Sequence, residues 1–342
     1  MDLTKEEISE IKELFSYPKG IAIISHRNPD GDAIGSSLGL RYFLEKFGHT
    51  VKVVLPSEYP LTFHYLKGID DCIIFDHEQS KAKEILTKAD VIVCLDFNSL
   101  DRIDKIGPVV EASKAKKILI DHHLDPEPFA DYIYSDIHAS STCELVHKFI
   151  IDMGEGGKLD PTIGEALFTG LITDTGSFKY NTRSDTYDTA SALKSIGVDD
   201  YNLQDKIFNC VTEKQMRLLG HCLANRMEIL PEYAAGIIAL TKQDYKDFDI
   251  QRGDTEGVVN YLLMLKGIEV AAFIREQPTI VKLSLRSKGD ISVQEICRNH
   301  FNGGGHKNAS GGAAYAKLED IINRFKNVLP RYVKKRIVAQ AQ

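Results

Sequence analysis

Short apolar runs alternate with amphipathic segments along the first half of the chain. Residues 33–48 and 80–90 repeat apolar positions at helical spacing, and the apolar stretch 164–175 predicts a buried helix. Continuous apolar strands with helices between them are typical of a parallel sheet that is covered on both faces. We therefore predict an α/β fold for this half. The predicted strands are 20–25, 51–55, 72–76, 91–96 and 117–121.

The pattern changes after about residue 225. Strand-like segments follow, and a Gln277-Pro278 turn joins two of them as a hairpin. A helix at 291–301, a glycine-rich loop at 302–312 and a helix near 318–329 complete a mixed α+β module. The predicted parts of the chain are a larger domain (1–195), a helical linker (196–225) and a smaller domain (226–342).

Length and charge restrict the class of protein. At 342 residues the chain exceeds what one hydrophobic core usually serves, which agrees with two domains. Its 42 basic and 49 acidic residues give a formal net charge of −7. This balance argues against the binding of long duplexes, because such binding usually needs a broad basic surface.

The cysteines and the apolar runs indicate the compartment. Six cysteines stand singly, without a CxxC pair, and predict neither a zinc ribbon nor a disulfide framework. The N-terminal segment is acidic and amphipathic, unlike a signal or transit peptide. No apolar run approaches the ~18 residues that a membrane span requires. We therefore expect a cytoplasmic protein that has no membrane partner.

Histidines and aspartates follow several of the apolar segments directly. The segment HRNPDGD comes straight after 20–25 and places His26, Asp30 and Asp32 within seven residues. The carboxyl ends of parallel strands converge on one edge of a sheet, where open α/β folds bind ligands. The other side chains expected at this edge are Asp96, Asp121, His122, His123 and, from a helix, Asp174.

Each of these motifs also has a purely structural interpretation. The segment 29–32 favours a turn, Asp96 suits a helix cap and Asp174 suits a helix end. Several carboxylates in one place repel one another, however, since two unit charges ~4 Å apart cost about 4 kcal/mol at an effective dielectric of 20. Their joint occurrence at strand ends therefore favours a cation site over separate coincidences.

The donors indicate which ions fit and how many. Oxygen-rich sites with some imidazole suit Mn²⁺ best here, with Mg²⁺, Co²⁺ and Fe²⁺ as alternatives. The ligands are too many for one ion. The sequence therefore predicts two divalent metal ions that share a bridging carboxylate; in phosphoryl-cleaving enzymes such pairs sit about 3.5–4 Å apart.

The segments HRNPDGDAIGS, LDFNSLDR, IDHH and LITDTGSF, followed by a GGGH motif, resemble the DHH phosphoesterase family with its DHH-associated C-terminal domain. The nanoRNase and pAp-phosphatase branch (NrnA-like) is the most similar, and the resemblance covers nearly the whole chain. It implies an N-terminal parallel-sheet domain and a smaller C-terminal α+β domain, with a cleft between them. One departure is the segment 96–98, Asp-Phe-Asn, where many members carry Asp-Thr-Gly.

The resemblance assigns the metal ligands to two ions. His26 and Asp30 would bind one ion, and Asp96 would bridge it to the other. The remaining ligands of the second ion would be Asp32, His122 and Asp174.

The resemblance also implies the catalytic and substrate-binding residues. His123 would face the substrate phosphate, where it would serve as a donor or a proton source, and Asp121 would support the neighbouring histidines. Consecutive glycines let backbone N–H groups approach a phosphate closely, which agrees with a substrate site in the second domain. The implied substrate-binding residues are Arg102, Arg286, Gly303, Gly304, Gly305 and His306.

With this resemblance, we predict an enzyme that hydrolyses short oligoribonucleotides (nanoRNA and linear dinucleotides) and 3′-phosphoadenosine 5′-phosphate (pAp), using a hydroxide held between the two metal ions. Three alternatives stay open: a stand-alone cyclic di-AMP phosphodiesterase, a RecJ-like single-strand exonuclease and a non-catalytic nucleotide-binding regulator. The sequence leaves the oligomeric state open, a homodimer included.

Overall fold

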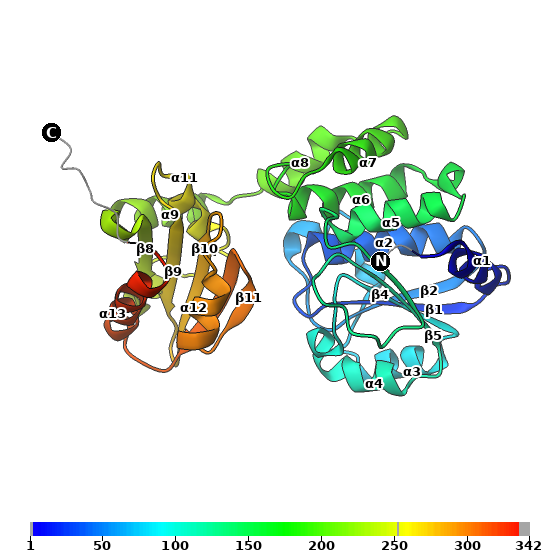
Figure 1. Cartoon of the computed structure of the whole chain (residues 1–342), viewed down its shortest axis with the longest axis horizontal. Coiled ribbons are helices and arrows are strands. Elements are labelled where there is room, and N and C mark those ends of the chain that lie inside the picture. The colour runs from blue at the N-terminus through cyan, green and yellow to red at the C-terminus, as the bar shows by residue number, and fades with distance from the viewer. Residues whose placement is uncertain (1–2, 252, 335–342) are drawn as a thin grey trace. The chain divides into compact units, whose positions relative to one another are not determined.

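The computed structural model of the protein describes residues 3–251 and 253–334. The chain divides into two compact units, 1–210 and 211–342, which Figure 1 shows in blue to green and in green to red. Each unit is described by itself. The predicted domain limits and the predicted cleft stay predictions. Among the described residues, no helix is long and apolar enough to cross a membrane.

The first unit is built on a six-stranded sheet in the order β3-β2-β1-β4-β5-β6. All five pairings are parallel, so the predicted parallel sheet is confirmed. The strand order reverses between β1 and β4, and open α/β sheets bind ligands at such a point, beyond the carboxyl ends of the strands. The strands are β1 (Gly20–Ser25), β2 (Thr50–Leu55), β3 (Ile73–Ile74), β4 (Val91–Leu95), β5 (Lys116–Asp121) and β6 (Tyr132–Ser135).

Helices cover both faces of this sheet (Figure 1). One hydrophobic core joins the strands to α1, α2, α5 and α6, and a second joins them to α3 and α4. The predicted helix at 33–48 is confirmed, but it begins at Gly31 and ends at Glu45, since Asp30 caps its first turn. The helices are α1 (Lys5–Leu14), α2 (Gly31–Glu45), α3 (Gln79–Lys88), α4 (Gly107–Ala112), α5 (Thr142–Asp152), α6 (Pro161–Asp174), α7 (Ser184–Ser195) and α8 (Asp200–Phe208).

Helices α2 and α6 pack against each other unusually closely. A Cβ on Gly39 would lie 2.6 Å from Leu167, and a Cβ on Gly170 would lie 2.7 Å from the Oδ1 atom of Asp32. Near the start of α2, a Cβ on Gly31 would collide with Thr173. The two helices therefore run in opposite directions, and the end of α6 lies beside the start of α2.

The second unit contains a mixed sheet in the order β11-β12-β10-β9-β8-β7. Only the β8–β9 pairing is parallel, and the predicted hairpin is confirmed by the antiparallel β9–β10 pair. The strands are β7 (Met227–Leu230), β8 (Ala235–Leu240), β9 (Val270–Glu276), β10 (Val281–Ser287), β11 (Gly304–His306) and β12 (Ala309–Ala314). The helices are α9 (Glu213–Asn225), α10 (Lys242–Asp247), α11 (Val258–Met264), α12 (Val293–His300) and α13 (Leu318–Val328).

The glycine-rich segment at 302–312 differs from its prediction. It forms the β11–β12 hairpin, and only Lys307 and Asn308 connect the two strands. The sequence pattern predicts a loop because glycine has a low strand propensity, but here the absence of side chains permits close strand contact. Within the described residues, the 3₁₀ segments are η1 (Leu61–Phe63), η2 (Ile69–Asp71), η3 (Leu100–Ile106), η4 (Gly156–Lys158), η5 (Pro231–Tyr233) and η6 (Leu329–Arg331).

Candidate metal centre

The end of β1 supplies the first pair of candidate ligands. His26 directly follows the strand and is buried, whereas Asp30 is exposed at the N-cap of α2. The Oδ1 atom of Asp30 accepts hydrogen bonds from the backbone N–H groups of Asp32 and Ala33, at 3.0 and 3.1 Å. The same oxygen lies 3.8 Å from Nε2 of His26. The predicted turn therefore forms a helix cap and directs Asp30 towards His26.

Asp96 occupies the centre of the cluster. It follows β4, is 2% exposed and has a φ of +65°, a left-handed conformation that turns its side chain away from the path of the strand. Its two oxygens face different partners. Oδ2 lies 3.3 Å from Nε2 of His26, and Oδ1 lies 3.5 Å from Nε2 of His122.

A second group of ligands surrounds His122, which follows β5. Its Nε2 atom lies 3.8 Å from Oδ2 of Asp32 and 3.6 Å from Oδ2 of Asp174. Asp32 projects from the first turn of α2, and Asp174 is the last residue of α6. The close packing of these helices therefore brings together two carboxylates that are 142 positions apart in the sequence.

Asp121 and His123 form a separate pair within the same cluster. Asp121 is fully buried, and its Oδ1 atom lies 2.7 Å from Nδ1 of His123. The other carboxylate oxygen accepts the backbone N–H of His123 at 3.2 Å. Nδ1 of His122 instead lies 3.3 Å from the carbonyl oxygen of Ala139. Asp121 is thus placed to orient His123, whereas a backbone carbonyl orients His122.

The sequence analysis does not identify the N-terminus of α5 as a part of the site. The N–H groups of Thr142 and Cys143 donate to the two oxygens of Asp32, at 2.6 and 2.9 Å, and the Thr142 hydroxyl donates to Asp96 at 3.1 Å. A helix N-terminus stabilises a carboxylate in this way. The only sequence signal is the spacing of Ser141 and Glu144, which is typical of a helix N-terminus, and Ser141 is the N-cap of α5.

Burial and neighbouring charges together shift the pKa values of this cluster. Burial raises the pKa of Asp174 to about 7; the charge of His122 opposes this rise, and the charges of Asp96 and Asp30 add to it. Burial and the charges of Asp96 and Asp174 raise the pKa of Asp32 well above its usual value. Burial lowers the pKa of His122, but hydrogen bonding to Asp96 and nearby negative charge more than offset this and raise it. Such a cluster binds protons unless cations replace them.

The donor set fits divalent ions. Carboxylate oxygens combined with imidazole nitrogens suit Mn²⁺ and its neighbours in the first transition row. In each of three overlapping groups, one ligand atom from every side chain lies within 4.8 Å of the others. The groups are His26, Asp30 and Asp96; Asp96, His122 and His123; and Asp32, His122 and Asp174.

Arg102 lies on η3, which follows β4, and is half-buried. Its carbonyl oxygen accepts the backbone N–H of Arg27 at 2.9 Å. The guanidinium of Arg27 in turn forms ion pairs with Asp76 at 2.8 Å and Asp104 at 3.1 Å. These contacts join the segment after β1 to the segment after β4, and so hold Arg102 near the predicted ligands.

The remaining predicted residues lie together in the second unit. A Cβ on Gly303 would collide with the backbone of Gly311, and Gly305 has a φ of +140°, so both positions require glycine. Arg286 on β10 and His306 on β11 are both in register with Ala309 of β12. Residues in register on neighbouring strands share a face of the sheet. The structure therefore places Arg286 and His306 on one face of the second sheet.

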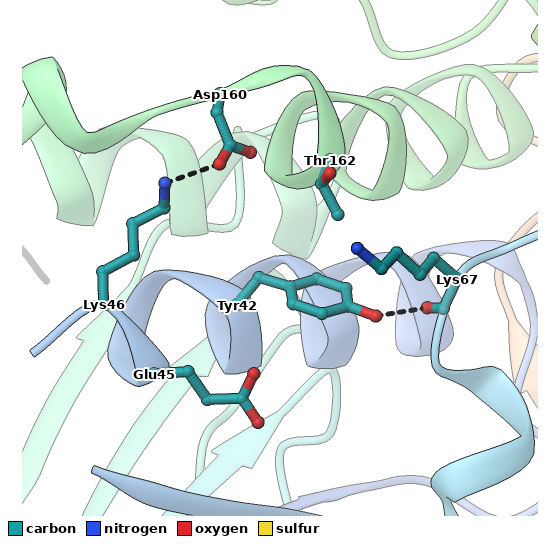
Figure 2. A pocket seen from close by; sticks show the side chains of 6 residues that line it. All are labelled: Tyr42, Glu45, Lys46, Lys67, Asp160 and Thr162. Carbon is teal, nitrogen blue, oxygen red and sulfur yellow. Dashed lines mark hydrogen bonds and ion pairs between the residues drawn. The ribbon is translucent and has the colours of Figure 1, made fainter. Parts of the chain in front are cut away.

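A surface hollow of about 300 Å³ lies elsewhere, between α2 and α6 (Figure 2). Lys46 and Asp160 form an ion pair at its rim at 2.5 Å, and the Tyr42 hydroxyl donates to the carbonyl of Lys67 at 2.7 Å. The hollow lies at the C-terminal end of α2 and the N-terminal end of α6. Asp32 and Asp174 lie at the other ends of these helices, roughly 20 Å from the hollow at 1.5 Å per residue. Tyr42, Lys46 and Asp160 already have partners, and the hollow is separate from the candidate metal centre.

The fold and the cluster agree with what comparisons with known proteins show. A family model described as the DHH family, N-terminal domain, matches residues 20–171, and one described as the DHHA1 domain matches residues 233–334. The chain belongs to the DHH family and carries a DHHA1 domain. The predictions of the family, the fold class and an enzyme of the hydrolase class are confirmed.

Several curated relatives match most of the chain. A probable bifunctional oligoribonuclease and PAP phosphatase NrnA from Streptococcus mutans is 30% identical over 315 residues, which cover 90% of this chain and 94% of that protein. The bifunctional oligoribonuclease and PAP phosphatase NrnA from Bacillus subtilis is 29% identical over 90% of this chain and 93% of its own length. The cyclic-di-AMP phosphodiesterase PdeA from Listeria monocytogenes is 27% identical, and the chain spans 45% of its length.

Solved structures share the fold. An exopolyphosphatase-related protein from Bacteroides fragilis is 40% identical with a TM-score of 0.94, over 96% of this chain and 98% of that one. RecJ from Thermus thermophilus, in complex with Mn²⁺, has a TM-score of 0.55 at 14% identity over 96% of this chain and 55% of its own. The RecJ likeness shows a common fold.

Proposed function

We propose that the protein hydrolyses phosphoesters in short oligoribonucleotides and in pAp with the help of two divalent metal ions, most readily Mn²⁺. The observation that carries this proposal is the position of Asp96. Its two oxygens face His26 and His122, which belong to different groups of ligands, at 3.3 and 3.5 Å. A carboxylate in this position suits a bridge between two ions.

The relatives support this choice of substrates. Three proteins named as oligoribonuclease and PAP phosphatase match 90–95% of this chain and 93–94% of their own lengths. The named cyclic-di-AMP phosphodiesterases also match, but the chain spans only 45–49% of their lengths. The identity is 29–30% with the first group and 27% with the second, so we place the nanoRNase and pAp-phosphatase activity first and keep cyclic di-AMP as the second candidate substrate.

The chain's own residues would divide the work as follows. His26 and Asp30 would hold one ion, and Asp96 would bind both ions. The remaining ligands of the second ion would be Asp32, His122 and Asp174. Divalent ions held there would offset the negative charge of the phosphoryl oxygens and lower the pKa of bound water.

The catalytic pair would act on the leaving group. Asp121 holds Nδ1 of His123 at 2.7 Å and so fixes the orientation of the ring. As water attacks phosphorus and the bond to the ester oxygen breaks, His123 would give a proton to that oxygen.

The second unit would bind the far end of the substrate. Arg286 and His306 lie on one face of its sheet, in register with Ala309, and the exposed Gly304 and Gly305 leave the backbone accessible to a phosphate or a terminal ribose. Arg102 would contact substrate beside the ions. A substrate held at both ends is short, so the proposal predicts selection by length.

The test is a rate profile with Mn²⁺ over RNA of two to five nucleotides, pAp, linear pApA, cyclic di-AMP and a 24-nucleotide RNA. We expect AMP from pAp and faster degradation of the short RNAs than of the 24-mer. Equal rates on the 24-mer would contradict the selection of short substrates. Cyclic di-AMP as the best substrate would favour the second candidate, and binding without turnover of any substrate would favour a regulator.

Two variants separate the roles of the units. We expect Asp96→Ala to abolish turnover, because it removes the bridging carboxylate. Arg286→Ala should mainly raise KM, because it removes a substrate contact that is remote from the reacting bond. Retention of most activity in Asp96→Ala would contradict the two-ion assignment.

A further inference from the structure

One short segment controls the orientation of three proposed metal ligands. Residues 139–143 contribute the carbonyl that faces His122 at 3.3 Å, the two N–H groups that bind Asp32 at 2.6 and 2.9 Å, and the hydroxyl that binds Asp96 at 3.1 Å. A displacement of this 139–143 segment would therefore move donors on both sides of the cluster. Contacts of this kind fix ring orientation and ligand basicity in metal sites.

The carboxylate of Glu144 holds the 139–143 segment in place. Glu144 lies in the first turn of α5 and is 4% exposed. Its Oε2 atom accepts both the backbone N–H of Ser140 at 3.1 Å and the Ser140 hydroxyl at 2.5 Å. In return, the hydroxyl of Ser141 accepts the backbone N–H of Glu144 at 3.0 Å. The segment is thus fixed by two reciprocal interactions with the helix that it precedes.

The N-terminus of α7, with its N-cap residue Arg183, also contacts the Glu144 carboxylate. The Thr186 hydroxyl donates to the same Oε2 atom at 2.9 Å, and the Arg183 guanidinium lies 3.4 Å from Oε1. Arg183 also pairs with Asp136, which lies at the start of the connection between β6 and α5, at 3.2 Å. A buried carboxylate near other acids is costly unless it is paired and hydrogen-bonded, and these contacts meet both conditions.

We propose that Glu144 is a positioning residue for the metal centre. It touches none of the proposed ligands; its carboxylate fixes the 139–143 segment, which in turn orients Asp32, Asp96 and His122. This inference rests on the proposed metal-dependent function. It adds a role for the N-terminus of α7, where Arg183 and Thr186 fix the direction of the Glu144 carboxylate.

The test compares Glu144→Gln with Ile150→Val in the full chain. Glutamine keeps the shape of the side chain, but it cannot offer two charged oxygens to Ser140, Thr186 and Arg183. Ile150 is a fully buried residue of the same helix, and its truncation to valine costs about 0.5–1.5 kcal/mol of stability without touching the 139–143 segment. It therefore controls for a loss of stability alone.

The readouts are calorimetric titration with MnCl₂, turnover of pAp, and urea unfolding without metal. We expect Glu144→Gln to weaken Mn²⁺ binding by about 10- to 100-fold and to lower kcat, as other substitutions behind metal ligands do. Ile150→Val should bind Mn²⁺ within about twofold of the wild type. Ser140→Ala, which removes only the 2.5 Å contact, should show a smaller loss of Mn²⁺ affinity of the same kind.

Wild-type affinity in Glu144→Gln, or an equal loss in Ile150→Val, would overturn the inference while leaving the proposed function intact. If Glu144→Gln does not fold, wild-type Mn²⁺ affinity in Ser140→Ala overturns it. Failure of the wild type itself to bind Mn²⁺ would overturn the proposed function and the inference together.

Discussion

Replacement of Gly170 by alanine tests how the packing of α2 on α6 places the metal ligands. Gly170 is a buried residue of α6, and a Cβ at this position would lie 2.7 Å from Oδ1 of Asp32 and even closer to the Cys143 sulfur. An ordinary contact needs at least 3.4 Å, so the distance to Asp32 must increase by 3.4 − 2.7 = 0.7 Å. The side chain of Asp32 is held by the N-terminus of α5 and has little freedom to move alone.

Two opposing effects determine how much Gly170→Ala changes the free energy of unfolding. Overpacking of a tight core costs about 1–3 kcal/mol. Alanine in place of glycine within a helix recovers about 1 kcal/mol. The free energy of unfolding of Gly170→Ala should therefore fall by only about 0–2 kcal/mol. A misplacement of catalytic groups by about 1 Å can lower the reaction rate about 10²-fold. The kcat for pAp should therefore fall roughly 10- to 100-fold.

The matched control is Gly220→Ala on α9, where a Cβ would meet nothing within 4 Å. The assays are urea unfolding and phosphate release from pAp with Mn²⁺. We expect Gly220→Ala to gain about 0.5–1 kcal/mol of stability through helix propensity with unchanged activity. Activity of Gly170→Ala within twofold of the wild type would refute the link between this packing and the site.

Three further predictions concern protons and metal. The pKa of Asp174 is raised to about 7 and that of His122 is also raised, so protons compete with cations for these side chains. The Mn²⁺ affinity measured by calorimetry should therefore fall about tenfold per pH unit below pH 7 for each proton displaced. Addition of Mn²⁺ at 100 times its dissociation constant should raise the free energy of unfolding by about 2.7 kcal/mol, and a chelator should reverse this; an unchanged melting curve would count against the site. In the second unit, Arg226, Thr241 and His221 outweigh burial and lower the pKa of Asp244 to about 2. The resulting stabilisation is present above the unfolded pKa near 4 and lost as pH falls through 2. The wild type should therefore lose about 2 kcal/mol relative to Asp244→Asn between pH 5 and pH 2 in urea titrations.

The sequence predicts the first sheet well because its central strands are continuous apolar runs. β1, β4 and β5 form as predicted, since Val and Ile favour fully buried strands. β6 is not predicted, because its short segment Tyr132–Ser135 mixes aromatic and polar residues at the edge of the sheet. The β11–β12 hairpin is mistaken for a loop, because it is stabilised by close contact of glycine backbones and not by side chains.

The side chains of the candidate site are better predicted than the groups that orient them. His26, Asp96 and His122 stand out because each follows an apolar strand directly, and strand ends converge in a parallel sheet. The N–H groups of Thr142 and Cys143 carry no such signal, since any residue at a helix start offers them. The left-handed conformation of Asp96 is equally invisible, because it depends on the fold around β4.

Anomalous X-ray diffraction at the manganese edge, from crystals grown with Mn²⁺, tests the central claim most directly. We expect two manganese peaks about 3.5–4 Å apart. Asp96 should direct one carboxylate oxygen to each peak, or share a single oxygen between the two peaks. His26 and Asp30 should contact one peak, and Asp32 and Asp174 the other. A single peak, or two peaks that Asp96 does not join, would contradict the two-ion site.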